Sequence, residues 1–324
     1  MNDFAGRRIA VTGASGFIGG RVVERLALGT GAEVRALVRG YGRVARLSVL
    51  PQDRLAFRTV DLDSPQSLSK ALHGCDLVVH CAFGSQGEVA DRWRTTVDGT
   101  AQLLAAAKLA GVERLVHVST VDVYDTTGLT RFDETAPALA EDPDDREYEQ
   151  QKAAAERLVL AAHGDGPDIV VIQPGVVYGP WGGQWTTAQL TRPAAEFDEL
   201  PVTGAGGACN AVYVDDVADA VLAALTEPAA AGRKFLVNGP DEPDWGAFFD
   251  RLRGIRGLPA PSGTATGGAV PDWEQALYAS PARADAARAA EVLTAPRTTL
   301  DEGMERTAEW ARWAGYGAPG GAAR

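Results

Sequence analysis

The chain has 324 residues, 45% of them hydrophobic, so it can bury a sizeable core without a disulfide framework. Its formal net charge of −12 makes a nucleic-acid partner or an anionic membrane surface unfavourable, and no apolar run approaches the roughly twenty residues of a membrane span. The three cysteines, Cys75, Cys81 and Cys209, have no metal-ligand spacing, so we expect free thiols, no metal site and a cytoplasmic location.

Short β-branched runs alternate with alanine-rich helical stretches along the first half of the chain, a pattern typical of βαβ units. We predict an α/β fold: a doubly wound parallel sheet of the Rossmann type with a smaller C-terminal lobe that binds the substrate. We expect the sheet domain at 1–177, the lobe at 178–316 with the chain crossing back near 208–226, and a tail at 317–324. The predicted strands are Arg8–Thr12, Glu33–Val38, Leu55–Val60, Leu77–Cys81, Arg114–Ser119 and Ile169–Gln173.

The first predicted strand leads directly into a glycine-rich segment that opens a helical pattern over Gly20–Leu28. Gly13 permits a tight turn, Gly16 lets the backbone approach a pyrophosphate, and Gly19 allows the helix to pack closely. Free N–H groups and the positive end of the helix dipole would bind the phosphates. The segment predicts a dinucleotide site, and the alternative is an ordinary glycine-rich turn. The expected cofactor contacts are Gly13, Ser15, Gly16, Phe17, Ile18 and Gly19.

The second predicted strand is followed by Arg39, where an NAD-selective chain carries an acid that holds the ribose 2′-hydroxyl. Arg39, together with Arg43 and Arg46, offers guanidinium groups suited to a 2′-phosphate. We therefore favour NADP(H) as the cofactor, with NAD(H) as the alternative if these arginines only solvate a loop. After the third strand, Asp61 and Leu62 lie where the adenine amino group could be recognised, although the segment could instead supply a helix N-cap.

The chain holds one Tyr-x-x-x-Lys pair, Tyr148 and Lys152, among seven tyrosines and four lysines. On a helix, residues four apart project from one face. A phenol with a pKa near 10 is a poor acid-base catalyst at neutral pH, and a neighbouring ammonium would lower that pKa. We predict a catalytic pair, and the alternative is a surface helix whose tyrosine caps the core beside a solvated lysine.

With these motifs, the chain resembles the extended short-chain dehydrogenase/reductase superfamily, in its NAD(P)-dependent epimerase/dehydratase branch, over roughly the first 220 residues. The resemblance implies that Thr120 hydrogen-bonds the reacting oxygen, which completes a Thr-Tyr-Lys triad, and that Lys152 also bridges the nicotinamide ribose hydroxyls. It further implies cofactor contacts from Cys81, Ala82, Pro174, Val176 and Val177. The motifs that carry it are Thr12–Gly19, Asp61-Leu62, His80-Cys81-Ala82, Ser119-Thr120, Tyr148–Lys152, Pro174–Pro180 and Val214–Val217.

Four positions depart from the pattern of that family. Thr96 stands where the family usually has asparagine, and Gln173 replaces a common arginine. Cys209 stands where sugar-nucleotide enzymes usually carry an arginine that grips the substrate diphosphate, which weakens the case for a nucleotide-sugar substrate. Asp122 is a single carboxylate where dehydratases use a consecutive acid pair, so dehydration is disfavoured. Asp122 is a candidate base, and the alternative is a loop residue that caps or solvates.

We expect an NADP(H)-dependent oxidoreductase of the ketoreductase type, which moves a hydride between nicotinamide and a carbonyl or secondary alcohol carbon of a small molecule. The alternatives are an epimerase of a sugar or sugar-nucleotide that retains its NAD(P), and a non-catalytic nucleotide-sensing protein. Two alanine-rich helices, at 90–110 and 147–162, and the family resemblance predict a homodimer. Candidate substrate contacts are Asp122, Trp181, Trp185 and Asn210, with packing as an equal alternative for the two tryptophans.

Overall fold

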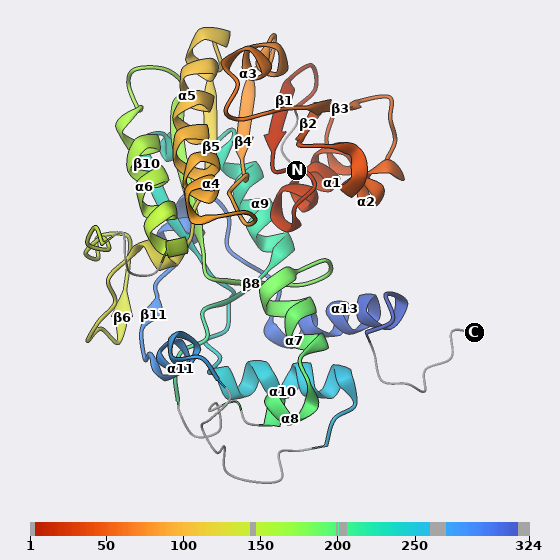
Figure 1. Cartoon of the computed structure of the whole chain (residues 1–324), viewed down its shortest axis with the longest axis vertical. Helices are drawn as coiled ribbons and strands as arrows, with labels where there is room; N and C mark the ends of the chain where they lie inside the picture. Colours follow the sequence, from red (N-terminus) through yellow and green to blue (C-terminus); the bar gives the residue numbers. More distant parts are fainter. Residues whose placement is uncertain (1–3, 143–146, 199, 201–205, 260–269, 317–324) are drawn as a thin grey trace.

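Seven parallel strands form the central sheet of the computed structural model, which describes residues 4–142, 147–198, 200, 206–259 and 270–316 (Figure 1). The spatial order is β10-β7-β5-β4-β1-β2-β3. The strand order reverses between β1 and β4, and an open α/β sheet binds its ligand at the carboxyl ends of such strands. The strands are β1 (Arg8–Thr12), β2 (Glu33–Val38), β3 (Leu55–Thr59), β4 (Leu77–His80), β5 (Arg114–Val118), β7 (Asp168–Pro174) and β10 (Arg233–Val237).

The predicted fold class is confirmed, and six of the strands match the predicted ones to within one residue at each end. The six predicted strands do not include β10, so the predicted number of strands in the sheet is wrong. β10 pairs with β7, and its residues 235–237 are buried. The chain therefore returns to the sheet domain as far as Val237. The predicted tail, 317–324, lies outside the described residues.

Helices cover both faces of the sheet (Figure 1). On one face α1 and α9 contact each other and bury Leu26 and Val221 in a shared core. On the other face α3, α5 and α6 bury Leu68, Leu103 and Val159. Because both faces are covered, the strands read as nearly continuous apolar runs. The helices are α1 (Phe17–Gly29), α2 (Ala45–Ser48), α3 (Pro65–Leu72), α5 (Gly99–Ala110), α6 (Glu147–Ala161) and α9 (Val214–Ala224).

The helix predicted over 90–110 is interrupted. It begins as α4 (Val89–Trp93), passes through a single π turn (Arg94–Asp98) and continues as α5. Thr96 lies in the π turn and is buried. There its hydroxyl accepts a hydrogen bond from the backbone N–H of Gly84 at 2.8 Å and donates one to Oε1 of Gln151 at 3.1 Å. Thr96 thus ties this helix to the segment after β4 and to α6.

The C-terminal lobe has its own aromatic core of Trp245, Phe248, Phe249 and Tyr278. Trp245 stacks on Phe249 and lies edge-on to Phe248, and Phe249 lies edge-on to Tyr278. Two short parallel pairs, β8 with β9 and β6 with β11, connect the lobe to the sheet domain. None of the described helices is long and apolar enough to cross a membrane. The elements are β6 (Arg131–Phe132), β8 (Val176–Tyr178), α7 (Ala188–Thr191), α8 (Ala194–Asp198), β9 (Ala211–Tyr213), α10 (Trp245–Arg256), α11 (Asp272–Ala279), β11 (Arg283–Ala284), α12 (Ala287–Val292) and α13 (Leu300–Trp313).

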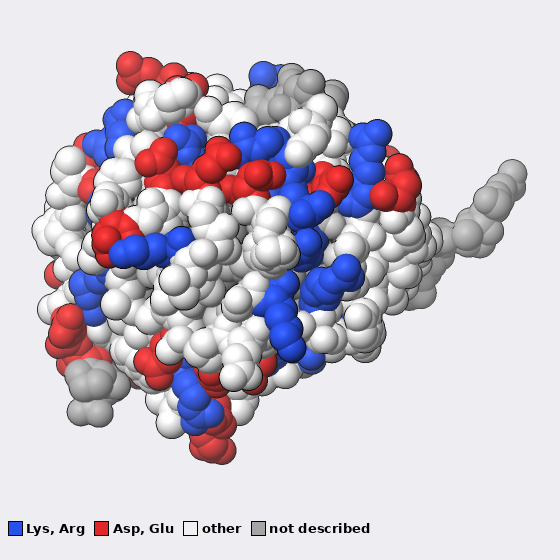
Figure 2. Space-filling model, turned by 90° about the horizontal axis from the view of Figure 1, so that it is seen from above, with Lys and Arg blue, Asp and Glu red and all other residues white. Residues whose placement is uncertain are grey.

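Charged side chains at the amino ends of the strands are paired. Arg8 bonds Glu33 at 2.6 Å, and Arg7 bonds Glu113 at 2.7 Å. Figure 2, which views the molecule from above relative to Figure 1, shows acidic and basic side chains interspersed over that face. Exposed pairs of this kind contribute little to stability.

Candidate active site

The glycine-rich loop lies at the carboxyl end of β1, beside the carboxyl end of β4. Gly13 has a φ of 64°, and a Cβ added there would lie 2.8 Å from the backbone nitrogen of Ala82. A Cβ on Gly19 would overlap the carbonyl oxygen of Gly13. Both the backbone conformation and the packing of α1 against the loop therefore require glycine.

The start of α1 is open to an external anion. The helix begins at Phe17 with Gly16 as N-cap, and neither a side-chain cap nor an acidic residue is present in its first turn. The first N–H groups of a helix have no partner within the helix, and its dipole favours negative charge there. Ser15 and Ile18 are half-buried in the same segment. The loop and the helix start thus fit the pyrophosphate of a dinucleotide.

The three arginines near the end of β2 have different surroundings. Arg39 and Arg43 are exposed, and in the part of the chain that the structure describes neither makes an ion pair. Arg46 instead donates from Nε to Glu24 at 2.6 Å, and its guanidinium lies 5.6 Å from the centroid of the Trp181 ring. Arg39 is therefore available to a ligand, whereas Arg46 holds α2 against α1.

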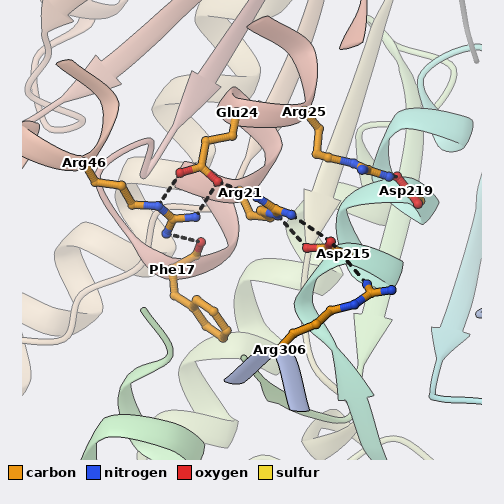
Figure 3. A network of polar contacts seen from close by, with 8 residues as sticks. All are labelled: Phe17, Arg21, Glu24, Arg25, Arg46, Asp215, Asp219 and Arg306. Atoms are coloured by element: carbon orange, nitrogen blue, oxygen red, sulfur yellow. Dashed lines mark hydrogen bonds and ion pairs between the residues drawn. The ribbon is translucent and has the colours of Figure 1, made fainter. Parts of the chain in front are cut away.

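Arg46 belongs to a polar network between α1 and α9 (Figure 3). Arg21 donates to Glu24 at 2.9 Å and to Asp215 at 2.7 Å, and a further pair joins Arg25 to Asp219. Burial raises the pKa of Glu24, but the guanidinium groups of Arg46 and Arg21 outweigh it, so the pKa is lowered overall. The network holds the helix that carries the phosphate loop against the returning part of the chain.

Asp61 and Leu62 follow β3, as predicted. The N-cap of α3 is Ser64, whose hydroxyl accepts from the backbone N–H of Ser67 at 3.3 Å. Asp61 accepts from the backbone N–H of Asp63 at 3.0 Å and is exposed, while Leu62 is buried. The helix cap is thus separate from Asp61, whose role toward adenine stays a prediction.

The end of β5 and the start of α6 bring Thr120, Tyr148 and Lys152 together. Tyr148 is 42% exposed, whereas Lys152 is only 4% exposed. Nζ of Lys152 donates to the carbonyl oxygen of Val118 at 2.7 Å, which leaves two of its three N–H donors for a ligand. The hydroxyl of Thr120 lies near enough to the phenol of Tyr148 to lower its pKa. Two hydroxyl groups thus meet beside a buried amine.

The pKa values of this pair are shifted by burial. Burial lowers the pKa of Lys152 to about 8. The pKa of Tyr148 is raised, first by burial and then by the nearby Asp122 carboxylate, and Thr120 opposes the shift. This direction is opposite to the one predicted from a neighbouring ammonium. A phenol that stays protonated is a proton donor, which the reduction of a carbonyl requires.

Asp122 orients Thr120. Its Oδ2 accepts from the Thr120 hydroxyl at 2.8 Å, and its backbone N–H donates to the same hydroxyl oxygen at 3.2 Å. The Asp122 side chain is exposed. The local capping interpretation accounts for these contacts, and the role of Asp122 as a base stays a prediction.

The other predicted cofactor residues lie at the same edge of the sheet. Pro174 ends β7 and Val176 begins β8, with Gly175 packed so closely on Asn210 that a Cβ would overlap its carbonyl oxygen. Cys81 and Ala82 directly follow β4 and contact the loop at Gly13. Val177 is half-buried. All of these positions therefore follow the carboxyl ends of sheet strands, on the side of the sheet that carries the glycine loop.

The predicted substrate residues of the lobe divide into two kinds. Trp185 packs on Trp245, with ring centroids 5.0 Å apart, as part of the aromatic core. Asn210 donates to the carbonyl of Ala282 at 3.0 Å and accepts from the backbone N–H of Ala284 at 2.9 Å, so its amide joins two segments of the chain. Trp181 is 43% exposed and has a φ of 69°, a left-handed conformation that is costly for a non-glycine residue.

Comparison with known proteins agrees with this geometry. The model of the NAD dependent epimerase/dehydratase family matches residues 9–238. The chain belongs to this family. Like its relatives among the reductases, epimerases and dehydratases, it is an enzyme of the extended short-chain dehydrogenase type.

Several proteins similar to this chain are named as reductases. The chain is 32% identical to "Dihydroflavonol 4-reductase" of Zea mays over 247 residues, which is 69% of this chain and 68% of the relative. It is 35% identical to "4-hydroxy-2-methyl-3-oxo-4-farnesyl-3,4-dihydroquinoline-1-oxide ketoreductase" of Stigmatella aurantiaca over 53% of this chain and 51% of the relative. The fold matches that of UDP-glucuronic acid 4-epimerase from Bacillus cereus, solved with UDP-glucuronic acid and NAD, with a TM-score of 0.73 at 22% identity over 95% of this chain and 99% of that one.

Two residues beside the site, Phe83 and Glu156, were not predicted from the sequence. Phe83 is 41% exposed, lies edge-on to Tyr148 with ring centroids 5.8 Å apart, and has its ring centroid 6.0 Å from Nζ of Lys152. Glu156 is 4% exposed and lies one helical turn beyond Lys152. The helical period from Tyr148 through Lys152 could have indicated Glu156. Phe83 carries no comparable signal.

Proposed function

We propose that the chain is an NADP(H)-dependent ketoreductase, which moves a hydride between nicotinamide and the carbonyl or secondary alcohol carbon of a small molecule. The observation that carries the proposal is the placement of Tyr148: the residue is 42% exposed, it lies near the hydroxyl of Thr120, and the buried Lys152 follows it by one helical turn. A protonated phenol beside a second hydroxyl is suited to bind a carbonyl oxygen and to transfer a proton to it.

The three residues have distinct proposed roles. Thr120, oriented by Asp122, holds the reacting oxygen, and Tyr148 donates the proton to that oxygen in the direction of reduction. Lys152 directs its two remaining N–H donors toward the nicotinamide ribose and keeps a positive charge near the phenol. The bound nicotinamide would supply the hydride.

The proposed cofactor site extends from the glycine loop to the end of β7. Backbone N–H groups at Phe17, Ile18 and Gly19 would bind the pyrophosphate. The exposed guanidinium of Arg39 would bind a 2′-phosphate and so favour NADP(H) over NAD(H). The remaining proposed contacts are Gly13, Ser15, Gly16, Asp61, Leu62, Cys81, Ala82, Pro174, Val176 and Val177.

A small molecule without a diphosphate is the proposed substrate. Cys209 is 1% exposed and burial raises the pKa of its thiol, so this position itself offers no positive charge to a sugar-nucleotide diphosphate. Phe83 and Tyr148 offer an apolar wall beside the reacting position. Asp122 and Trp181 stay in the proposed substrate site, whereas the contacts of Trp185 and Asn210 favour structural roles. A homodimer in the cytoplasm remains our expectation.

The decisive experiment combines nucleotide analysis with a substrate screen. A ketoreductase exchanges its cofactor, so the purified protein should carry little bound nucleotide and should oxidise NADPH only when a ketone is added. An epimerase would instead retain stoichiometric nucleotide and consume none. Stoichiometric bound NAD with no ketone-dependent oxidation of NADPH would contradict the proposal.

A further inference from the structure

A buried polar cluster lies behind Lys152. Glu156 follows Lys152 by one turn of α6, and both residues are 4% exposed. Gln173, on β7, donates its amide to both carboxyl oxygens of Glu156, at 2.9 and 3.0 Å. Tyr124 in turn donates to Oε1 of Gln173 at 2.8 Å. The buried acid one turn beyond Lys152 on α6 is therefore fixed in place by a neutral amide.

Few charges act on this buried acid. The neutral amide of Gln173 bonds both carboxyl oxygens of Glu156, and among the described residues no arginine forms an ion pair with this acid. Burial raises the pKa of Glu156, while the Ser119 hydroxyl, Gln173, Lys234 and Lys152 all lower it by smaller amounts. Lys234 lies on β10, with Nζ 4.6 Å from the centroid of the Tyr124 ring.

Three groups near Lys152, namely Cys81, His80 and His117, carry no charge at neutral pH. The pKa of the Cys81 thiol is about 12 and that of His80 about 3, and burial holds the pKa of His117 well below its ordinary value. Asp122 and Glu149 act on the Tyr148 phenol. Cys81 and Glu156 both raise the pKa of Lys152, and the high pKa of the Cys81 thiol leaves that group neutral at neutral pH.

We propose that Glu156 is a positioning residue, whose carboxylate holds the amine of Lys152 in its charged form over the working pH range. The inference rests on the proposed catalytic role of Lys152. Lys152 and Glu156 are both buried and lie one helical turn apart on α6, so their titrations are coupled. The hydrogen bonds from Lys152 to Val118 and from Gln173 to Glu156 favour the ammonium and carboxylate forms together. Removing the carboxylate would leave a buried ammonium without a counter-charge.

The charge of Lys152 can be measured directly by carbon NMR of protein labelled at the lysine ε-carbon, because the chain has only four lysines. Substitution of Lys70, Lys108 and Lys234 by arginine, one at a time, assigns their signals and so identifies that of Lys152. We expect Lys152 to titrate with a midpoint near 8 in the parent and about one pH unit lower in Glu156→Gln. In Glu156→Asp, which keeps the carboxylate, the midpoint of Lys152 should lie close to that of the parent.

Tyr124→Phe is the matched control, since it removes a hydroxyl from the same cluster without changing its charge. This variant should leave the titration midpoint of Lys152 unchanged. An unchanged titration midpoint of Lys152 in Glu156→Gln would overturn the proposal. A parent protein in which Lys152 is already neutral at neutral pH would also overturn it, and that measurement needs no variant. The titration uses neither cofactor nor substrate, so a failure of the proposed ketoreductase activity would be seen separately.

Discussion

The ammonium of Lys152 donates a hydrogen bond of 2.7 Å to the carbonyl of Val118, the last residue of β5. This bond fixes a charged side chain of α6 at the carboxyl end of the central strands. The buried amine therefore lies where the sheet binds its ligand, with two donors unused.

Lys152→Met should weaken NADPH binding by roughly tenfold or more, since a charge-assisted hydrogen bond contributes about 1.5 to 3 kcal/mol. Affinity in the parent should also fall as the pH rises through about 8, because the amine then loses its proton. Fluorescence titration of NADPH against pH measures both effects. Lys70→Met, at an exposed position, is the control. Equal affinity in Lys152→Met and the parent would exclude this contact.

Arg39→Ala should reduce the preference for NADPH over NADH. One or two charge-assisted hydrogen bonds to a 2′-phosphate give a preference of roughly tenfold or more, since about 1.4 kcal/mol is one decade. Calorimetric dissociation constants for both cofactors give the ratio. A parent that binds NADH as tightly as NADPH would show that Arg39 is not the ligand.

Arg46→Ala is the informative control for Arg39. Its guanidinium is engaged by Glu24 and lies against Trp181, so the cofactor ratio should stay unchanged. The free energy of unfolding should instead fall by about 1 to 3 kcal/mol, because a partly buried carboxylate loses a partner. Urea unfolding measures this loss.

The contrast between these two arginines shows what sequence reasoning could and could not reach. The glycine loop, Tyr148 and Lys152 follow local patterns whose spacing directly encodes geometry, so they were predictable. The pairing of Arg46 with Glu24 is decided by how α2 packs on α1, which no local pattern encodes. β10 was missed for the same reason: its five residues become a strand through pairing with the distant β7.

UDP- and dTDP-sugars should bind weakly or not at all. The position at which family members that act on sugar nucleotides usually place an arginine holds Cys209, a buried side chain that supplies no positive charge. Isothermal calorimetry with UDP-glucose, in the presence of NADPH, tests this expectation. Tight binding would mean that another residue supplies the positive charge.

The protein should be a homodimer that pairs α5 and α6 of two copies. Leu109, at the end of α5, is 88% exposed, and Leu158 of α6 is 36% exposed. Light scattering at micromolar concentration should give twice the chain mass, and Leu109→Glu should give the monomer. Leu28→Glu, on α1 at the opposite face of the sheet, should remain a dimer. A monomeric parent would refute the assembly.

The most direct test of the central claim is the steady-state reduction of a ketone by NADPH in Tyr148→Phe. The variant keeps the ring that packs on Phe83 and loses only the hydroxyl that meets Thr120. We expect kcat to fall by roughly two to four orders of magnitude, the usual contribution of a general acid, with NADPH affinity nearly unchanged. Tyr41→Phe, at an exposed tyrosine, should match the parent. A kcat in Tyr148→Phe close to that of the parent would contradict the account.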